Sequence, residues 1–340
     1  MPSILITGAS GFIGSFIVEE ALTQGFEVWA AVRSTSSRQY LTDARIRFIT
    51  LSLGDEAALR REVADHVAAH GPWQYVVHAA GATKCLSKAD FFRTNTEGTE
   101  RLARVLTESG ALKGRMVFIS SLSVMGAPHE GSKQAITERD TPHPNTAYGR
   151  SKLEAEQRLA AIAGLDYVVL RPTGVYGPRE RDYFLMAKSI CRHIDTSVGL
   201  RPQRLTFIYV LDLVQAVFLA LTRGERGDVF HLSDGRDYSQ RAYSDLLQKA
   251  LGVRGVWHLR LPLWVLRVAC FAGETMAHVT HKPSTLNNDK YHIMKQRNWR
   301  CDISHAESVL GYRPRYTLAL GVSESVAWYK KAQWLCLSLP

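Results

Sequence analysis

The chain has 340 residues, 46% of them hydrophobic, which is enough for two units that share a sizeable core. Its formal net charge of +10 suits an anionic ligand such as a nucleotide phosphate, although a solvated basic surface gives the same count. No run of Lys and Arg is long enough, or interleaved with enough aromatic residues, to argue for nucleic acid, so we expect no such partner.

The cysteines and the N-terminus favour a cytoplasmic protein. Five cysteines are scattered without a C-x-x-C pair or a metal-like spacing with His, so we expect reduced thiols and no metal. The chain enters a strand pattern at Ser3–Thr7, so we expect no signal or transit peptide before it. The longest apolar run, Leu261–Gly273, contains Arg267 and is too short to span a bilayer. We interpret it as a helix of a second domain, with contact to a membrane surface as the alternative.

The first half of the chain alternates short β-branched runs with helical patterns. The expected strands are Ile4–Thr7, Val28–Val32, Arg47–Leu51, Tyr75–His78, Met116–Ser120 and Tyr167–Arg171. The expected helices are Phe12–Gln24, Glu56–His70, Gly98–Ser109 and Thr146–Ala163. Such alternation is typical of β-α-β units and predicts an α/β fold, a Rossmann-type doubly wound parallel sheet.

The alternation breaks down after Pro172, where we place a domain boundary. Residues 1–172 are expected to form a domain that binds NAD(P). Residues 173–340 are expected to form mainly a smaller C-terminal α/β domain that binds the substrate. Within them, residues 205–221 would return to the first domain, where a strand, Leu205–Tyr209, and a helix, Leu211–Leu221, would rejoin the sheet.

A glycine-rich turn follows the first strand and opens the first helix. Gly8 permits a tight turn, Gly11 lets a pyrophosphate approach the backbone, and Gly14 lets the helix pack closely on the strand. The free N–H groups and the dipole at the helix start attract the diphosphate. The residues of this turn predicted to bind a dinucleotide are Gly8, Ser10, Gly11, Phe12, Ile13 and Gly14.

The end of the second strand distinguishes NAD from NADP. NAD sites usually place an acidic residue there to bind the ribose hydroxyls. Here Arg33 and Ser34 open a run of hydroxyl residues, which suits a 2′-phosphate and offers no carboxylate to repel it. We therefore favour NADP over NAD, the alternative being a solvated polar loop.

The fourth strand ends in His78-Ala79-Ala80-Gly81, at the sheet edge where ligands bind in such folds. The small residues would let the cofactor lie on bare backbone, so Ala79, Ala80 and Gly81 are predicted cofactor contacts. We interpret His78 as a packed residue rather than a catalytic one.

Tyr148 and Lys152 are four residues apart and would share one face of a helix. A free phenol titrates near 10, and a neighbouring ammonium together with a positive nicotinamide ring would lower that pKa toward the working pH. Ser120 and Ser121 end the fifth strand, where a hydroxyl could bond the substrate oxygen while Tyr148 transfers a proton. Tyr291 and Lys295 have the same spacing but no such strand before them, so we treat that pair as chance.

Together these residues resemble the extended short-chain dehydrogenases/reductases, the NAD-dependent epimerase/dehydratase superfamily, over nearly the whole chain. The resemblance implies Ser121, Tyr148 and Lys152 as the catalytic triad, with Asn95 in support. It also implies that Tyr148 and Lys152 contact the cofactor. The residues implied to line the nicotinamide amide are Pro172, Thr173 and Val175. Family members tend to dimerise through two helices that flank the sheet, which implies a homodimer.

The sequence departs from the nucleotide-sugar enzymes of this family at their phosphate anchors. Leu205-Thr206 replace an Arg and its Asp partner, and residues 297–302 lack the usual Arg-Pro-Gly-Asp loop. Leu122-Ser123 replace the Asp-Glu pair of dehydratases, and Ser52 replaces an acidic residue that contacts adenine.

The C-terminal part is instead similar to the branch of 3β-hydroxysteroid dehydrogenases, sterol dehydrogenases and dihydroflavonol reductases, through Leu261–Trp264, Lys282–Leu286 and Leu310–Pro314. This similarity implies an oxidoreductase that interconverts a secondary alcohol and a ketone, with a hydrophobic small-molecule substrate. Two alternatives remain: a nucleotide-sugar epimerase with tightly bound NAD, and a non-catalytic cofactor-sensing protein on the same fold.

Overall fold

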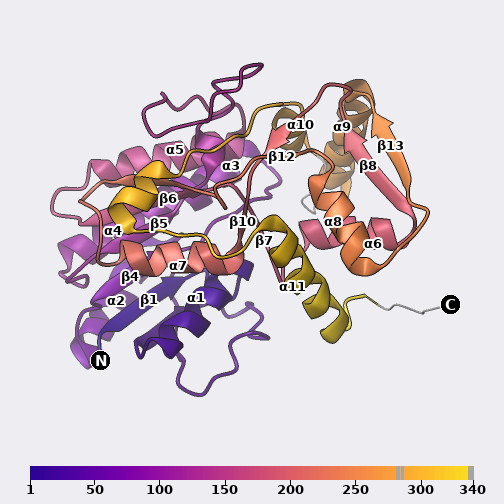
Figure 1. Ribbon diagram of the computed structural model, residues 1–340. Helices are drawn as coiled ribbons and strands as arrows, with labels where there is room; N and C mark the ends of the chain where they lie inside the picture. Colours follow the sequence, from indigo (N-terminus) through magenta and orange to yellow (C-terminus); the bar gives the residue numbers. More distant parts are fainter. Residues whose placement is uncertain (281–283, 285–286, 336–340) are drawn as a thin grey trace.

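The computed structural model describes residues 1–280, 284 and 287–335, and its centre is a seven-stranded parallel sheet (Figure 1). The strand order is β11-β6-β5-β4-β1-β2-β3. The strands are β1 (Ser3–Thr7), β2 (Glu27–Ala31), β3 (Arg47–Ile49), β4 (Tyr75–His78), β5 (Met116–Ile119), β6 (Tyr167–Pro172) and β11 (Val229–Leu232). All six expected strands are present, so the predicted α/β doubly wound fold is confirmed.

Helices cover both faces of the sheet. They are α1 (Phe12–Thr23) and α7 (Val210–Ala220) on one face, and α2 (Glu56–His70), α4 (Gly98–Glu108) and α5 (Ala147–Ala160) on the other. Side chains of a strand alternate between faces, so Ile4 and Ile6 pack in the core under α1, whereas Leu5 packs in the core under α2 and α4. The sheet is therefore buried on both sides, as parallel sheets usually are.

The expected return of residues 205–221 to the sheet is only half right. The helix α7 packs on the sheet, but the strand breaks into β9 (Arg204–Leu205) and β10 (Phe207–Tyr209). β10 pairs with β7 (Gly174–Tyr176) and β9 pairs with β12 (Tyr238–Ser239), so neither joins the main sheet. The seventh position, beside β6, is instead taken by β11.

The remaining elements of the second half gather at one end of the molecule (Figure 1). They are α6 (Asp182–Cys191), β8 (Ile194–Val198), α8 (Ala242–Leu251), β13 (Trp257–Leu261), α9 (Leu263–Thr280), α10 (Asn288–Met294) and α11 (Leu318–Lys331). Most of the apolar run at 261–273 falls on α9, as expected, although Leu261 ends β13. No helix of the described residues is long and apolar enough to cross a membrane. Residues 282, 283, 285 and 286 of the run Lys282–Leu286 lie outside the described residues. The domain boundary after Pro172 stays a prediction.

Arg179 ties the start of the second half to α1. It holds φ at +71°, a left-handed value that costs a non-glycine residue free energy. Its guanidinium donates to Ser15 Oγ at 2.9 Å and pairs with Glu19 at 2.6 Å. The same group stacks 4.2 Å from the centre of the Phe16 ring. These contacts hold the strained backbone in place.

A buried ion pair joins α5 to β6. Arg171 donates to Glu156 at 2.5 and 3.1 Å, and both side chains are 7% exposed. Removing one member leaves the other charge buried without its partner, which costs more than the pair contributes.

We therefore expect Glu156→Gln to lower the free energy of unfolding by about 3–5 kcal/mol. The matched control is Glu154→Gln, which removes an exposed partner of Arg158 and should change stability by less than about 0.5 kcal/mol. Urea unfolding measures the free energy of unfolding of both variants. Equal losses would show that breaking the buried pair costs no more than breaking the other one.

Candidate functional site

Five loops meet at the carboxyl edge of the sheet, where ligands bind in doubly wound folds. Across the sheet from β6 to β2, the residues at this edge are Thr173, Ser121, the turn Ala79–Gly81, Gly8 and Arg33. This order predicts an extended ligand, with one end at β5 and β6 and the other at β2.

The glycine turn after β1 leaves no room for side chains. Gly8 has φ +67°, and a Cβ there would lie 2.7 Å from the carbonyl carbon of Ala79. A Cβ on Gly14 would lie 2.1 Å from Gly8 O. Helix α1 begins after Gly11 without a side-chain cap, so its first N–H groups remain available to an anion. The turn therefore fits the diphosphate of NAD(P).

His78 is a structural residue, as expected. Its ring bonds Thr7 Oγ1 at 2.7 Å through Nδ1 and Thr99 Oγ1 at 2.9 Å through Nε2. Thr7 Oγ1 in turn accepts from Ala80 N at 3.2 Å. Burial lowers the pKa of His78 to about 3, so the ring is neutral at physiological pH and fixes the turn after β4.

Asn95 holds the loop after β4 against helix α5. It lies in a π-helical turn, Phe92–Glu97. Its Oδ1 accepts from Ala82 N at 2.7 Å, and its Nδ2 donates to Ala82 O and to Ser151 Oγ, both at 3.0 Å. A Cβ on Gly81 would lie 3.2 Å from Asn95 Oδ1 and 3.1 Å from Lys152 Nζ. The glycine therefore leaves the Asn95 amide and the Lys152 ammonium uncrowded.

Lys152 is buried on α5, beside the end of β5. Its Nζ donates to Ile119 O at 2.9 Å and lies 4.6 Å from the centre of the Phe118 ring. Burial lowers the pKa of Lys152 to about 8, although the carboxylate of Glu156 raises it. The ammonium is thus held at a fixed place with part of its hydrogen-bonding capacity free.

Tyr148 lies one turn before Lys152, near the start of α5, where Thr146 Oγ1 caps the helix by accepting from Gly149 N at 2.9 Å. Burial raises the pKa of Tyr148 to about 12, and a hydrogen bond with Ser121 lowers it. In the protein alone this pKa thus lies above its usual value, because desolvation disfavours the phenolate and the Lys152 ammonium bonds a backbone carbonyl. The expected lowering by Lys152 together with the nicotinamide ring stays a prediction.

The two serines at the end of β5 point to different places. Ser120 Oγ donates to Glu156 Oε1 at 2.5 Å, in the buried layer between α5 and the sheet. Ser121 instead borders a cavity together with Tyr148, Pro172 and Thr173. The sequence allowed either Ser120 or Ser121 to bond the substrate oxygen, and of these two only Ser121 lines the cavity. Val175 does not line this cavity, and its expected contact with the nicotinamide amide stays a prediction.

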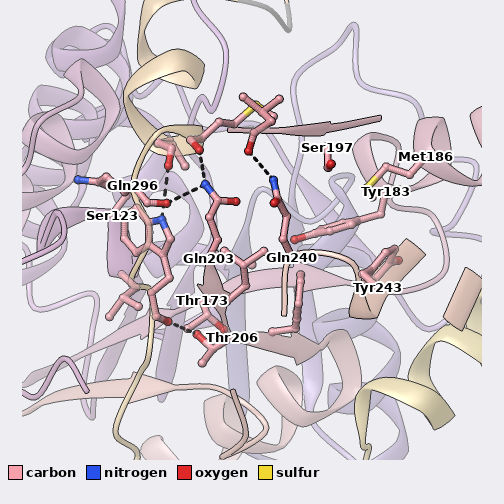
Figure 2. Close-up of a pocket in the computed structure, with 18 of the residues that line it drawn as sticks. Ser123, Thr173, Tyr183, Met186, Ser197, Gln203, Thr206, Gln240, Tyr243 and Gln296 are labelled. Atoms are coloured by element: carbon pink, nitrogen blue, oxygen red, sulfur yellow. Dashed lines mark hydrogen bonds between the residues drawn. The ribbon is translucent and has the colours of Figure 1, made fainter. Parts of the chain in front are cut away.

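The cavity has a volume of about 380 Å³ and lies between the sheet edge and the C-terminal half (Figure 2). Asp195 is the only charged side chain among the described residues that line it, and its carboxylate is bonded to His258 and Ser244. No described lining residue is Lys, Arg or His. The wall is largely apolar, with Leu122, Met186, Val198, Leu205, Phe207 and Trp299 among its residues.

A few polar atoms interrupt this apolar wall. Gln203 Nε2 donates to Met294 O at 2.6 Å, and Gln240 Nε2 donates to Val198 O at 2.6 Å (Figure 2). Both amide nitrogens are therefore engaged with the backbone. Three buried polar atoms of the lining have no hydrogen-bond partner within the described chain: Thr173 Oγ1, Tyr243 Oη and Gln296 Oε1. They can bond a small number of polar groups on a bound molecule.

The β2 end of the site is open and basic. Arg33 is exposed, and no carboxylate of the described residues forms a salt bridge with it. Its backbone N–H donates to Ser36 Oγ at 3.1 Å, which shapes the loop. After β3, Ser52 is bonded through its N–H and hydroxyl to the carboxylate of Glu62, at 2.6 and 2.7 Å. Sequence reasoning missed Glu62, because no local pattern links it to Ser52.

The second Tyr–Lys pair does not reach the cavity, although its helix α10 borders the site: Asp289 accepts from Tyr148 N at 3.0 Å, and Ile293 and Met294 line the cavity. Lys295 Nζ is 5.6 Å from the centre of the Tyr291 ring, and that ring packs against a small core of Val198, Leu266 and Cys270. Tyr291 does not line the cavity.

Known proteins resemble this chain along most of its length. A model of the NAD dependent epimerase/dehydratase family matches residues 4–233. UDP-glucose 4-epimerase of Vibrio cholerae is 27% identical and covers 97% of this chain and 96% of its own. A decarboxylating sterol-4-alpha-carboxylate 3-dehydrogenase of Dictyostelium discoideum is 26% identical, over 77% of this chain and 80% of its own. The structure of a Thermotoga maritima UDP-glucose 4-epimerase with UDP-glucose has a TM-score of 0.77 at 25% identity, covering 97% of this chain and 99% of that one.

Proposed function

The chain belongs to the NAD-dependent epimerase/dehydratase family of extended short-chain dehydrogenases/reductases, and from this premise we propose that it interconverts a secondary alcohol and a ketone. The observation that carries the proposal is the joint presence of Ser121 and Tyr148 on one cavity whose wall is largely apolar. We propose a hydrophobic substrate of the steroid, sterol or flavonoid kind, bound with its reacting carbon beside these two hydroxyls.

In this proposal each polar group has one task. Tyr148 Oη takes the hydroxyl proton of the alcohol, or returns it to the ketone oxygen, while Ser121 Oγ bonds that same oxygen. Bound NAD(P) supplies or accepts the hydride, and the positive charge of its oxidised ring favours the phenolate of Tyr148. Lys152 would bond the nicotinamide ribose, and Asn95 keeps the loop after β4 in place beside it.

A nucleotide-sugar epimerase with tightly bound NAD is the main alternative, since such enzymes are among the relatives. Diphosphates are held by cations or by free backbone N–H groups, and no described residue that lines the substrate cavity is Lys, Arg or His. Arg201, Lys295 and Arg297 line a neighbouring cavity that shares Gln203 and Gln296 with it. Leu205 and Thr206, which stand where those enzymes carry a phosphate anchor, line the substrate cavity themselves. A non-catalytic cofactor sensor is disfavoured because Tyr148 and Lys152 are both present.

A substrate panel tests the proposed class. We expect the purified protein to oxidise or reduce sterols or apolar cyclic ketones with added cofactor, and to bind UDP-glucose only weakly in calorimetry. Initial rates with NAD and with NADP measure the redox activity. Micromolar binding of UDP-glucose, or co-purification of NAD, would instead assign the protein to the epimerases.

Tyr148→Phe tests the acid/base role. The variant lacks the proposed proton donor, so we expect kcat to fall by about 10²-fold or more while the cofactor still binds. Tyr291→Phe removes the hydroxyl of the other Tyr–Lys pair and should leave kcat within a few-fold. If Tyr291→Phe were inactive and Tyr148→Phe active, the acid/base role would belong to Tyr291 and the assignment to Tyr148 would be wrong.

We further propose that NADP is preferred over NAD. The two cofactors differ by a 2′-phosphate, which would lie at the end of β2, beside Arg33 and Ser34. A charge-assisted contact from Arg33 should contribute about 1.5–3 kcal/mol, a preference of roughly ten- to a hundredfold. Because Arg33 is exposed, added salt should reduce that preference.

The ratio of kcat/KM for NADP and NAD measures this preference. Val32→Asp with Arg33→Ala should reverse it, because the carboxylate repels the phosphate and accepts from the ribose hydroxyls. Arg38→Ala is the control, since that guanidinium lies over the Phe48 ring at 4.1 Å and should matter less. A wild type that prefers NAD, or a ratio untouched by the double substitution, contradicts the proposal.

A further inference from the structure

Helix α9 is apolar on both of its faces. Leu266, Cys270 and Ala277 are buried, and the first two pack against Val198 of β8. At 100° per residue, the positions opposite this buried face are Trp264, Val268, Phe271, Thr275 and Val279. Four of these are large and apolar, with exposures of 68% for Trp264, 61% for Val268, 73% for Phe271 and 73% for Val279.

Strands β8 and β13 extend this exposed apolar surface. They pair in parallel, with Ile194 opposite Trp257 and Val198 opposite Leu261, so these residues share the sheet face on which α9 packs. Beyond the part that α9 covers, Ile194, Trp257 and Leu259 are 41%, 74% and 45% exposed. We call the exposed residues of α9, β8 and β13 together the α9 face. It lies at the end of the molecule away from the cofactor half (Figure 1).

Three arginines lie beside the α9 face. Arg201 follows the 69% exposed Leu200, Arg267 lies on α9, and Arg254 lies three residues before Trp257 in the sequence. All three are exposed, and none forms a salt bridge with a carboxylate of the described residues. The only acidic residue of α9 is Glu274, which lines a small pocket on the inner side.

We propose that the α9 face docks the enzyme on the surface of an anionic lipid bilayer. Exposed Trp and Phe side chains on an amphipathic surface are suited to the boundary of headgroups and acyl chains, and arginines around them are attracted by anionic headgroups. A second copy of the chain fits this face less well. A two-fold interface would bring the arginine border of one copy against that of the other.

The docked face also leads toward the substrate cavity. A second cavity of about 690 Å³ is bounded by Leu200, Pro262 and Leu263 next to the α9 face, and by Gln203 and Gln296, which it shares with the substrate cavity. Its lining also includes Glu130, Arg201, Lys295 and Arg297, so this cavity has a charged side as well as an apolar one. An apolar substrate dissolved in the bilayer would enter along the apolar side. This part rests on the proposed function, whereas docking itself does not.

Vesicle co-flotation tests the docking with the full-length protein and no turnover. We expect the wild type to float with phosphatidylcholine vesicles that contain 30% phosphatidylserine, and much less with phosphatidylcholine alone. Trp264→Ser with Phe271→Ser should weaken binding at least tenfold, and Arg201→Gln with Arg267→Gln at least fivefold on the anionic vesicles only. The matched control is Leu185→Ser with Leu320→Ser, which removes two exposed leucines on α6 and α11 and should change binding less than twofold.

Two further measurements make the result decisive. Thermal unfolding and NADP binding should be unchanged in all three double variants, because every substituted side chain is exposed. Sedimentation should give the same oligomeric state for the wild type and for Trp264→Ser with Phe271→Ser. Absence of flotation, equal flotation of all variants, or loss of a dimer in that aromatic variant would overturn the proposal, the last in favour of a second copy. Because no substrate is used, failure of the proposed redox function would leave this result intact.

Discussion

The site depends on a row of buried polar contacts that hold helix α5 on the sheet. We call this row, made by Lys152, Ser120, Glu156 and Arg171, the polar seam. Lys152 Nζ donates to Ile119 O at the end of β5, the next residue, Ser120, donates to Glu156, and Arg171 on β6 pairs with Glu156 from the other side. These groups lie in an interior that is otherwise apolar, so each must keep its partner to offset its desolvation. The helix consequently has one position relative to β5, and Tyr148 is held next to Ser121 with little freedom to move.

Burial also shifts the pKa values of the two titratable groups on α5. The pKa of Lys152 falls and that of Tyr148 rises for the same reason, since desolvation disfavours the charged form of each group. The phenol is therefore protonated in the protein alone, which suits a proton donor. The glycines at positions 8 and 14 complement this rigidity, because a Cβ on either would collide with the backbone of Ala79 or of Gly8.

The sequence predicted those parts of the molecule that are encoded locally. The six strands, the glycine turn and the Tyr148–Lys152 spacing are each visible in a short window, and the structure contains all of them. The assignment of residues 205–209 to the main sheet was wrong, because pairing of β10 with β7 is decided by distant residues. The same limit explains Glu62, whose carboxylate bonds Ser52 from another element. Burial of Tyr148, which sets its pKa, is likewise a property of the assembled fold.

Arg179 has a mechanical consequence for opening and closing of the substrate cavity. Its guanidinium clamps the segment that follows β7 onto α1 through Ser15, Glu19 and the Phe16 ring. The segment up to residue 179 is therefore fixed to the cofactor half. The ion pair of Lys84 with Asp182, at 2.6 Å, ties the first turn of α6 to that half as well, so the cavity wall that α6 provides is anchored at its base.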